Sequence, residues 1–357
     1  MSRLRMAVIG AGALGRHHAR ILSGFEHVEL VAVCDPRESA GTAVAGNCGA
    51  RWLADYRDAL DGIDACTIAV PTVLHHSIAM DVLGRGLPVL VEKPLTARLD
   101  EAEELVELAE ARGLTLAVGH VERFNPAMQA ARPLCAGAKY IRAERLSNYA
   151  FRSTDIGAVH DLMIHDLDLV LSLVESPVAR VEAFGVSILG GHEDAVQARI
   201  VFENGAIADL TANRVCPAAK RSLHVWAPDG VVTVDLSSRE VVRYRPSETL
   251  LYGTPPLERA AQPGADLEQL KAAVFGTFID VTRPAVPPGD ALTAELADFV
   301  ECIPTGRAPV VDGRAALKAL RVADEVLSSA HHHQWDGHVL GAVGPFVRAP
   351  QLRRKAG

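Results

Sequence analysis

The chain has 357 residues, with 36 Lys and Arg against 44 Asp and Glu, a formal net charge of −8 and a pI of about 6.0. This balance argues against a general nucleic-acid or anionic-membrane binder, because such partners select basic surfaces. It leaves room for an anionic small-molecule substrate, which needs only a local basic pocket. Hydrophobic residues make up 49% of the chain, so a sizeable core can form. The length suits about two domains of roughly 100–200 residues each.

The first 120 residues alternate short apolar strands with helical segments. The predicted strands cover 4–10, 28–35, 65–70, 87–94 and 115–120. The predicted helices cover 13–24 and about 74–86, and an acidic amphipathic helix follows Asp100. Continuous apolar strands separated by helices are typical of a parallel sheet that is covered on both faces.

After about residue 121 the pattern changes to the alternation of half-buried strands. Residues 139–147 alternate polar and apolar side chains, a helix is predicted at 165–175, and six further strand segments follow. Asn204-Gly205 stands where a hairpin turn is expected. These strands predict an antiparallel meander with one solvent face. Residues 246–290 are rich in Pro and Gly and are expected to be irregular, and two helical patterns close the fold.

The predicted architecture is therefore an α/β domain followed by an α+β domain with an open, mostly antiparallel sheet. The first domain is expected over 1–120 and the second over 121–330, with a C-terminal tail at 331–357. The histidines at 331–333 are weak evidence for metal binding, because they only follow a helix end.

The six cysteines are scattered without any CxxC spacing. This distribution is typical of reduced cytosolic proteins and not of a disulfide framework or a zinc ribbon. The N-terminal apolar stretch is too short for a signal peptide, and no run of 18 apolar residues predicts a membrane span. We expect a cytoplasmic protein.

The segment GAGALG, residues 10–15, has the G-x-G-x-x-G spacing between a predicted strand and a predicted helix. In such a loop Gly10 makes the turn, Gly12 lets the backbone approach a pyrophosphate, and Gly15 lets the helix pack on the strand. Together with Ala13 and Leu14 they form the predicted phosphate-binding loop at a helix N-terminus. The alternative is a tight packing turn. The surrounding strand and helix favour a dinucleotide site.

Asp35 ends the next strand, 20 residues after Gly15. A carboxylate there accepts hydrogen bonds from the ribose hydroxyls and repels a 2′-phosphate, so the sequence favours NAD over NADP. Arg37 weakens this preference, because its guanidinium is able to reach a phosphate.

VLVEKPL places Glu92 and Lys93 at the carboxyl end of a strand, where ligands of parallel sheets bind. Partial desolvation at this edge of the core is expected to lower the pKa of Lys93. The lysine is then suited to hydrogen-bond a substrate hydroxyl and to share its proton. The alternative is a strand-end lysine that reaches for solvent.

Five motifs occur in the order found in the glucose–fructose oxidoreductase/inositol dehydrogenase family (Gfo/Idh/MocA), which this chain resembles over about residues 1–330. They are GAGALG, CDP at 34–36, AVPTVLH at 69–75, VEKPL at 91–95 and DLMIH at 161–165. The resemblance implies a Rossmann domain and a C-terminal domain whose sheet carries the substrate and often the oligomer interface. It implies a homo-oligomer, a dimer or tetramer, formed through that sheet.

The resemblance also implies roles for individual residues. Pro71, Thr72 and His75 line the cofactor site, and Glu92 lies near the nicotinamide ribose. Lys93 matches the family's catalytic lysine. Asp161 and His165 match its D-x-x-x-H pair, whereas His160 departs from the family's mostly apolar residue there and stays unassigned.

Asp161 and His165 are four residues apart, so on a helix they share one face. A histidine is suited to accept a hydroxyl proton while a hydride leaves the same carbon, and an aspartate orients the ring. Either His165 or Lys93 takes the proton in this scheme. A metal site of His160, Asp161, His165 and Asp168 is the alternative, but the spacing lacks a known ligand arrangement, so no metal is predicted. Asp166 and Asp168 are expected to be structural or solvent-facing.

GHVERFNPA at 119–127 and the segment 147–168 resemble the UDP-N-acetylglucosamine 3-dehydrogenase branch of the family, whose 3-keto product feeds an aminotransferase in lipid A biosynthesis. The resemblance implies a nucleotide-sugar substrate oxidised at C3 with NAD. Arg123, Asn125, Tyr149 and Arg152 are the predicted substrate contacts. Arg123 alternatively pairs with an acid, and Asn125 alternatively serves a turn. A dehydrogenase of a free polyol such as inositol, an NAD-using glycosidase and a non-catalytic NAD sensor are the competing hypotheses.

Overall fold

The computed structural model describes residues 3–151, 156–189 and 192–333. The chain forms two compact units, each assembled from separate segments of the sequence. Unit 1 comprises residues 1–124, 151–168 and 289–325, and unit 2 comprises 125–150, 169–288 and 326–357. Sequence patterns describe neighbouring residues only, so they gave no indication that segments return to an earlier unit. The predicted boundary after residue 120 stays a prediction.

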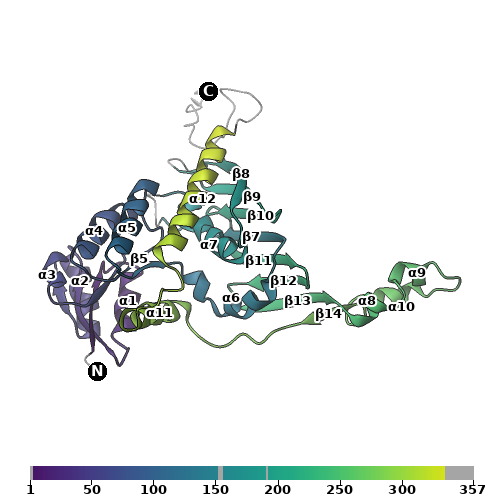
Figure 1. Cartoon of the computed structure of the whole chain (residues 1–357), viewed down its shortest axis with the longest axis horizontal. Coiled ribbons are helices and arrows are strands. Elements are labelled where there is room, and N and C mark those ends of the chain that lie inside the picture. Colours follow the sequence, from purple (N-terminus) through teal and green to yellow (C-terminus); the bar gives the residue numbers. More distant parts are fainter. Residues whose placement is uncertain (1–2, 152–155, 190–191, 334–357) are drawn as a thin grey trace, which may run out of the picture. The chain divides into compact units, whose positions relative to one another are not determined.

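Unit 1 contains a six-stranded sheet, which we call sheet A (Figure 1). Its order is β3-β2-β1-β4-β5-β6 and every pairing is parallel. The strands are β1 (Leu4–Ile9), β2 (Val28–Cys34), β3 (Arg51–Leu53), β4 (Ala65–Ile68), β5 (Val89–Glu92) and β6 (Leu116–Gly119). This is the strand order of a Rossmann sheet, so the predicted fold class of this region is confirmed.

The helices of unit 1 follow the strands in alternation. They are α1 (Gly15–Leu22), α2 (Glu38–Cys48), α3 (Arg57–Leu60), α4 (His75–Gly84), α5 (Leu99–Ala111) and α11 (Ala291–Thr305). Short 3₁₀ turns lie at Thr72–Leu74 and Val121–Phe124. The sequence pattern missed residues 38–60, because α2 buries only Gly41 and Ala45 and therefore lacks an apolar stripe.

Helix α11 joins the core of sheet A although it comes late in the chain. Its Leu296, Phe299 and Val300 are buried in one cluster with Met6 of β1 and Leu22 of α1. The apolar residues predicted for this helix therefore form its buried face.

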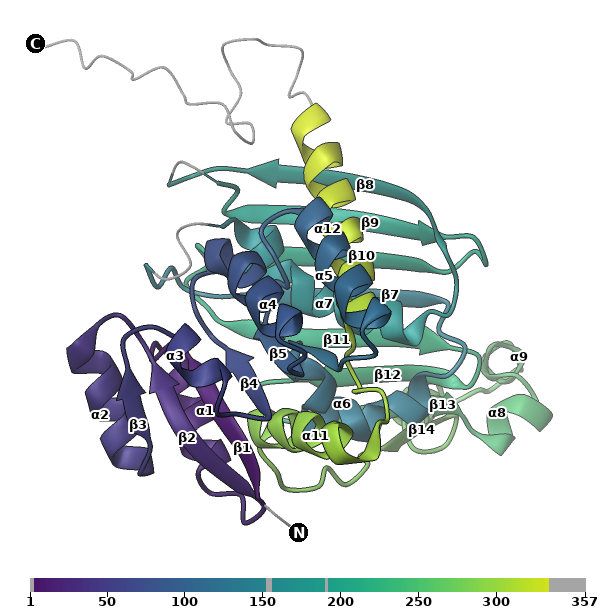
Figure 2. The ribbon, with the colours of Figure 1, turned by 60° about the vertical axis from the view of Figure 1, so that its left-hand side comes forward.

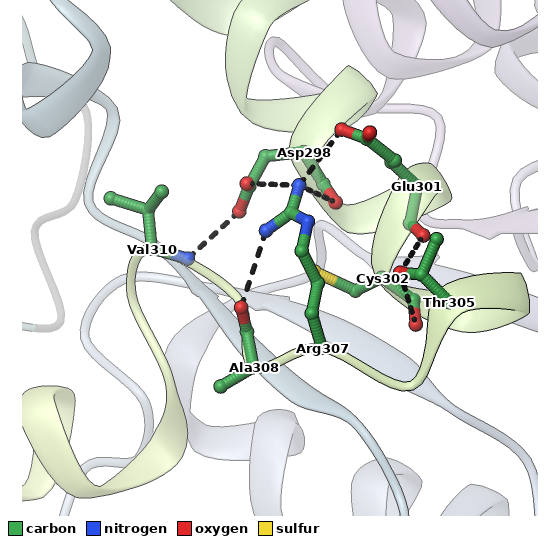
Figure 3. Close-up of polar contacts among 7 residues, drawn as sticks. All are labelled: Asp298, Glu301, Cys302, Thr305, Arg307, Ala308 and Val310. Atoms are coloured by element: carbon green, nitrogen blue, oxygen red, sulfur yellow. Dashed lines mark hydrogen bonds and ion pairs between the residues drawn. The ribbon is translucent and has the colours of Figure 1, made fainter.

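Polar contacts fix the chain where α11 ends (Figure 3). The helix closes on Gly306, whose positive φ of 66° lets its N–H donate to Cys302. Arg307 then pairs with Asp298 at 2.7 Å and with Glu301 at 2.9 Å, and Asp298 also accepts the N–H of Val310. These bonds tie the last turns of α11 to the segment that leads into α12 (Gly313–His332).

Unit 2 contains an eight-stranded sheet, sheet B, in the order β14-β13-β12-β11-β7-β10-β9-β8. Its strands are β7 (Tyr140–Leu146), β8 (Val178–Val186), β9 (Ala195–Phe202), β10 (Ile207–Asn213), β11 (Lys220–Ala227), β12 (Gly230–Asp235), β13 (Glu240–Pro246) and β14 (Ile279–Thr282). The pair β7–β10 is parallel and the other pairs are antiparallel. The predicted mostly antiparallel sheet is confirmed, whereas a pure meander was wrong because β10 returns to lie beside β7.

The expectation of an irregular segment at 246–290 was only partly right. This segment holds the short helices α8 (Glu248–Tyr252), α9 (Pro256–Ala260) and α10 (Leu267–Ala272), and then β14. Figures 1 and 2 show these helices beyond the β13–β14 edge of the sheet. None of the three helices has a buried residue, which explains the lack of an apolar pattern.

The remaining elements are α6 (Pro126–Ala131), a 3₁₀ turn at Arg132–Cys135, a π-helical turn at Val159–Met163 and α7 (Ile164–Leu173). In the ranges that the structure describes, no helix is long and apolar enough to cross a membrane.

Candidate active site

The glycine loop has the backbone geometry that a phosphate site requires. Gly10 has φ of 101°, and a Cβ on it would lie 2.4 Å from the carbonyl oxygen of Ala69. A Cβ on Gly15 would lie 1.8 Å from the carbonyl oxygen of Gly10. Both glycines are therefore required by the fold. A Cβ on Gly12 would meet no atom within 4 Å, so packing within the protein does not require a glycine there. Leu14 precedes α1 without a side-chain cap, which leaves N–H groups available to a pyrophosphate.

Asp35 follows β2 and is held by several donors. Its carboxylate accepts the N–H of Ala11 at 2.8 Å and a bidentate contact from Arg37, with both distances 3.0 Å. Burial raises the pKa of Asp35, but the hydrogen bonds from Arg37 and Ala11 outweigh it and hold the pKa below its ordinary value. Asp35 is therefore an anion beside the glycine loop, as a ribose-binding acid must be.

His75 ties the ends of two neighbouring strands together. Its Nδ1 lies 2.9 Å from the carbonyl oxygen of Pro94 and its Nε2 lies 3.0 Å from that of Val70. Burial lowers the pKa of His75, so the ring is neutral and donates to one carbonyl at a time. Thr72 is buried in the adjacent 3₁₀ turn and Pro71 is exposed before it.

Glu92, the last residue of β5, is buried in a hydrogen-bonded chain. Its Oε1 lies 2.9 Å from Nε2 of His18, and Nδ1 of His18 lies 3.2 Å from the hydroxyl of Thr67. The ring of His18 therefore joins the carboxylate of Glu92 to the hydroxyl of Thr67. Burial raises the pKa of Glu92, but the hydrogen bond from His18 and its charge outweigh it and hold the pKa below its ordinary value.

Lys93 is directed at Asp161, which is far from it in the sequence. The ammonium Nζ donates to the backbone carbonyl of Asp161 at 2.8 Å and lies 3.2 Å from its Oδ1. The lysine side chain is 13% exposed, so it does not simply reach for solvent. The structure therefore brings these two predicted residues together.

Asp161 and His165 do not lie on one regular α-helix. Asp161 belongs to the π-helical turn Val159–Met163, and α7 begins at Ile164. The wider turn changes how the two side chains project, and such turns occur often at functional sites. The half-buried ring of His165 contacts the ring of His120 edge-on, with centroids 6.4 Å apart.

Asp166 and Asp168 are both buried, which excludes the solvent-facing alternative and leaves the structural one. Asp168 accepts a hydrogen bond from Nε of Arg123 at 2.8 Å, and Arg123 is itself buried. The alternative foreseen for Arg123, an ion pair with an acid, is thus present. Within the described residues, no group of three or more His, Cys, Asp and Glu side chains is arranged to hold a metal ion.

Two of the other predicted substrate contacts, Asn125 and Tyr149, lie in unit 2. Asn125 caps α6 by accepting the N–H of Ala127 at 3.0 Å, and its amide donates to the carbonyl of Leu236 at 3.1 Å. Tyr149 lies under the guanidinium of Arg214, with 5.3 Å from the guanidinium carbon to the ring centroid. Arg152 lies outside the described residues. Substrate binding by these residues stays a prediction.

Two parts of the chain match family models. Residues 4–120 match the oxidoreductase family with an NAD-binding Rossmann fold, and residues 129–233 match the GFO/IDH/MocA C-terminal domain. The UDP-N-acetylglucosamine 3-dehydrogenase of Acidithiobacillus ferrooxidans is 32% identical over 327 residues, which are 91% of this chain and 97% of that enzyme. The chain belongs to the GFO/IDH/MocA oxidoreductase family.

One solved structure and one further relative of this GFO/IDH/MocA protein show how much of the chain the similarity covers. A solved structure of the Acidithiobacillus ferrooxidans enzyme matches with a TM-score of 0.79 at 30% identity, over 92% of this chain and 98% of that one. The scyllo-inositol 2-dehydrogenase (NAD(+)) of Bacillus subtilis is 30% identical over 60% of this chain and 68% of that enzyme. The predicted family, the two-part fold and a dehydrogenase that uses NAD are confirmed.

The sequence patterns of this GFO/IDH/MocA chain missed three buried polar residues near Glu92 and Lys93. His18 lies three residues after Gly15 on the buried face of α1, and His120 follows β6 directly. Glu295 falls beside Leu296 on the apolar face of α11. A titratable residue at an apolar position of a helix is the pattern that would have identified His18 and Glu295.

Proposed function

We propose that this chain is a dehydrogenase of a nucleotide-linked sugar, which oxidises C3 of UDP-N-acetylglucosamine to the 3-keto sugar with NAD. The observation that carries the proposal is Lys93 held by Asp161 at the carboxyl end of β5. Similarity over 91% of the chain to a UDP-N-acetylglucosamine 3-dehydrogenase supports this substrate. The 3-keto product is suited to consumption by an aminotransferase, which would make a 3-amino sugar.

The residues of the glycine loop and the neighbouring turns fit NAD. Gly10, Gly12, Ala13, Leu14 and Gly15 would hold the pyrophosphate, since Gly12 is open and the N-terminus of α1 is uncapped. Asp35 would bind the adenine ribose; because it is an anion it would repel a 2′-phosphate.

The nicotinamide end would be held by the residues that follow β4 and β5. Pro71, Thr72, His75 and Glu92 would line it, next to Lys93. NAD, when bound, supplies an acceptor for the hydride that leaves the hydroxyl-bearing carbon.

Lys93 is positioned to bind the hydroxyl that reacts. An ammonium has three N–H donors, and in the described residues two of them are directed at Asp161. The third is left for the oxygen of a substrate hydroxyl, whose developing negative charge the ammonium stabilises. Asp161 fixes the direction of the ammonium, and His165 on α7 is the proposed acceptor of the hydroxyl proton.

Arg123, Asn125, Tyr149 and Arg152 are the proposed substrate contacts. The ion pair of Arg123 with Asp168 and the capping role of Asn125 are compatible with an indirect part, in which each fixes its own segment of the chain. Alanine variants of Tyr149 and Arg152 are expected to raise KM for the sugar more than they lower kcat.

A substrate panel tests the proposal. UDP-sugars and free polyols are offered with NAD or NADP, and formation of reduced cofactor is followed by absorbance. We expect turnover of UDP-N-acetylglucosamine with NAD. A free polyol is the second candidate, because a scyllo-inositol 2-dehydrogenase is 30% identical over part of the chain. Turnover of inositol without turnover of any UDP-sugar would overturn the proposal.

We also propose that the chain forms a homo-oligomer through one face of sheet B. In register across seven strands, one row of that face holds only apolar or aromatic side chains: Val201, Ile207, Tyr140, Trp226, Val231, Tyr244 and Val281. Trp226 is 39% exposed, and its ring lies 5.1 Å from that of Tyr140. From β9 to β12 the adjacent row is polar and includes the Arg199–Asp209 pair. An apolar centre with a charged border is typical of a protein interface.

A further inference from the structure

Glu295 is a buried acid that the proposed reaction does not use. It lies on α11 and is 2% exposed, directly before Leu296, which belongs to the core of sheet A. Neither of its carboxyl oxygens has a hydrogen-bond partner in the described residues. Buried polar atoms of native proteins almost always have a partner, so an acid in this state calls for an explanation.

Three acids act on Glu295 and raise its pKa. They are Glu92 from the end of β5, Asp168 from α7 and Asp298 from α11 itself. Each of these acids already has a donor, since His18 bonds Glu92, Arg123 bonds Asp168 and Arg307 bonds Asp298. In the part of the chain that the structure describes, no basic side chain forms an ion pair with Glu295. Burial, followed by the charge of Glu92, therefore raises its pKa well above the ordinary range.

A protonated carboxyl is a hydrogen-bond donor and requires an acceptor. Glu92 is the strongest acceptor among the acids that act on Glu295, because it is an anion. Its Oε1 accepts from His18, whereas its Oε2 receives only the long 3.3 Å contact from the backbone N–H of Lys93. A carboxylate has about four lone-pair sites, so Glu92 is able to accept another donor.

We propose that Glu295 is a positioning residue for Lys93, which stays protonated and donates its O–H to the carboxylate of Glu92. His18 and Glu295 then hold Glu92 from two sides, and Glu92 in turn fixes the strand end from which Lys93 projects. Together, the buried carboxyl groups of Glu92 and Glu295 then carry one negative charge instead of two. That Lys93 acts on a substrate hydroxyl rests on the proposed function, whereas the state of Glu295 does not.

The protonation state is tested without any substrate. Infrared difference spectra on raising the pH of the free protein are expected to show the C=O band of a protonated carboxyl, which is absent from Glu295→Gln. Glu107→Gln, which changes an exposed acid on α5, is the matched control and should keep the band. Loss of the band in the control only, or its absence from the natural protein, would overturn the proposal.

Stability against pH gives a second measurement of the same state. In the unfolded chain Glu295 loses its proton above about 4.5, while in the folded chain it keeps it. Folding is therefore disfavoured progressively as pH rises above that value. We consider the ratio of the unfolding equilibrium constant of Glu295→Gln to that of the natural protein. This ratio should fall by about tenfold for each pH unit above pH 5, and the fall should stop at the pH where the folded acid ionises. A ratio that does not change with pH would contradict a protonated Glu295.

The positioning role is tested on turnover. Glu295→Leu removes the donor and is expected to lower kcat and to move the pH profile, with little change in KM for the sugar. Glu295→Gln retains an N–H donor and should restore both. In a Glu92→Gln background, Glu295→Leu should have little further effect, because the acceptor has changed.

An unchanged pH profile in Glu295→Leu, or a Gln variant as impaired as the Leu variant, would overturn the positioning role. Failure of the substrate panel with the infrared band present would reject the proposed function alone.

Discussion

Sheets A and B present their polar groups in different ways. In β4, β5 and β6 of sheet A every residue is buried, whereas β10 of sheet B alternates buried and half-buried side chains. A strand covered on both faces places polar groups at its end, where the backbone leaves the core. A strand with one open face presents every second side chain along its length. The chemistry proposed for this chain therefore lies at the strand ends of sheet A, and the proposed contact with a partner lies on the face of sheet B.

Replacing Lys93 is the most direct test of the proposal that the chemistry lies at the strand ends of sheet A. Lys93→Ala is expected to lower kcat by about 10²–10⁴-fold, the usual contribution of a group that handles a reacting proton. NAD affinity, measured by calorimetry, should be retained, since the lysine follows the strand and does not form the glycine loop. Lys318→Ala, which changes an exposed lysine on α12, is the control. Equal loss in both variants would contradict a role specific to Lys93.

The glycine loop separates residues required by the ligand from residues required by the fold. Gly12→Ala is expected to leave the melting temperature unchanged and to weaken NAD binding by at least about tenfold, or about 1.4 kcal/mol, because its Cβ meets no protein atom. Gly10→Ala should instead lower the free energy of unfolding by about 1–3 kcal/mol, because its φ is positive and its Cβ would lie 2.4 Å from a carbonyl oxygen. Calorimetry with NAD and thermal melts without it distinguish the two effects. If both variants lost stability, or both lost only NAD affinity, the two glycines would not differ in this way.

Glu92, at the buried end of β5, is expected to make the folding stability depend on pH. Because the folded pKa of Glu92 lies below its unfolded value, the acid contributes stability above an ordinary pKa of 4.5, and this contribution is lost as pH falls through the folded pKa. Glu92→Gln should therefore destabilise the protein at pH 7, by an amount that shrinks below pH 4.5. Denaturant melts at several pH values measure the difference. A difference that grows on acidification would mean that Glu92 is not held as an anion.

The face of sheet B is expected to give the smallest effect. Trp226→Ala removes an aromatic pair with Tyr140, which typically contributes about 0.5–1.5 kcal/mol beyond its buried area. We expect a shift of the association equilibrium in sedimentation or light scattering, with turnover per chain retained. A monomer in both the natural protein and the variant would reject the interface. A large loss of turnover in Trp226→Ala without a change in oligomer mass would contradict the assignment of chemistry to sheet A and of partner contact to sheet B.

Local sequence was sufficient for most of sheet A and for the residues at its strand ends. The apolar runs ended at Glu92 and Gly119 as expected, because such runs record burial on both faces. It failed at 38–60 and at 246–290, where the helices bury little apolar surface and leave no periodic pattern. The shared face of Asp161 and His165 was conditional on a helix, and the structure has a π-helical turn at Asp161 before α7 begins.

By itself the sequence determined the dinucleotide loop, the acid after β2, the lysine after β5 and the family, since each depends on residues close together in the chain. The tertiary structure alone decided which distant groups meet. It brought Lys93 to Asp161 and His18 to Glu92, and it buried Glu295 on α11 with no hydrogen-bond partner in the described residues. The physical reason is that burial and pairing fix the charge of a side chain, and both depend on elements that are remote in the sequence.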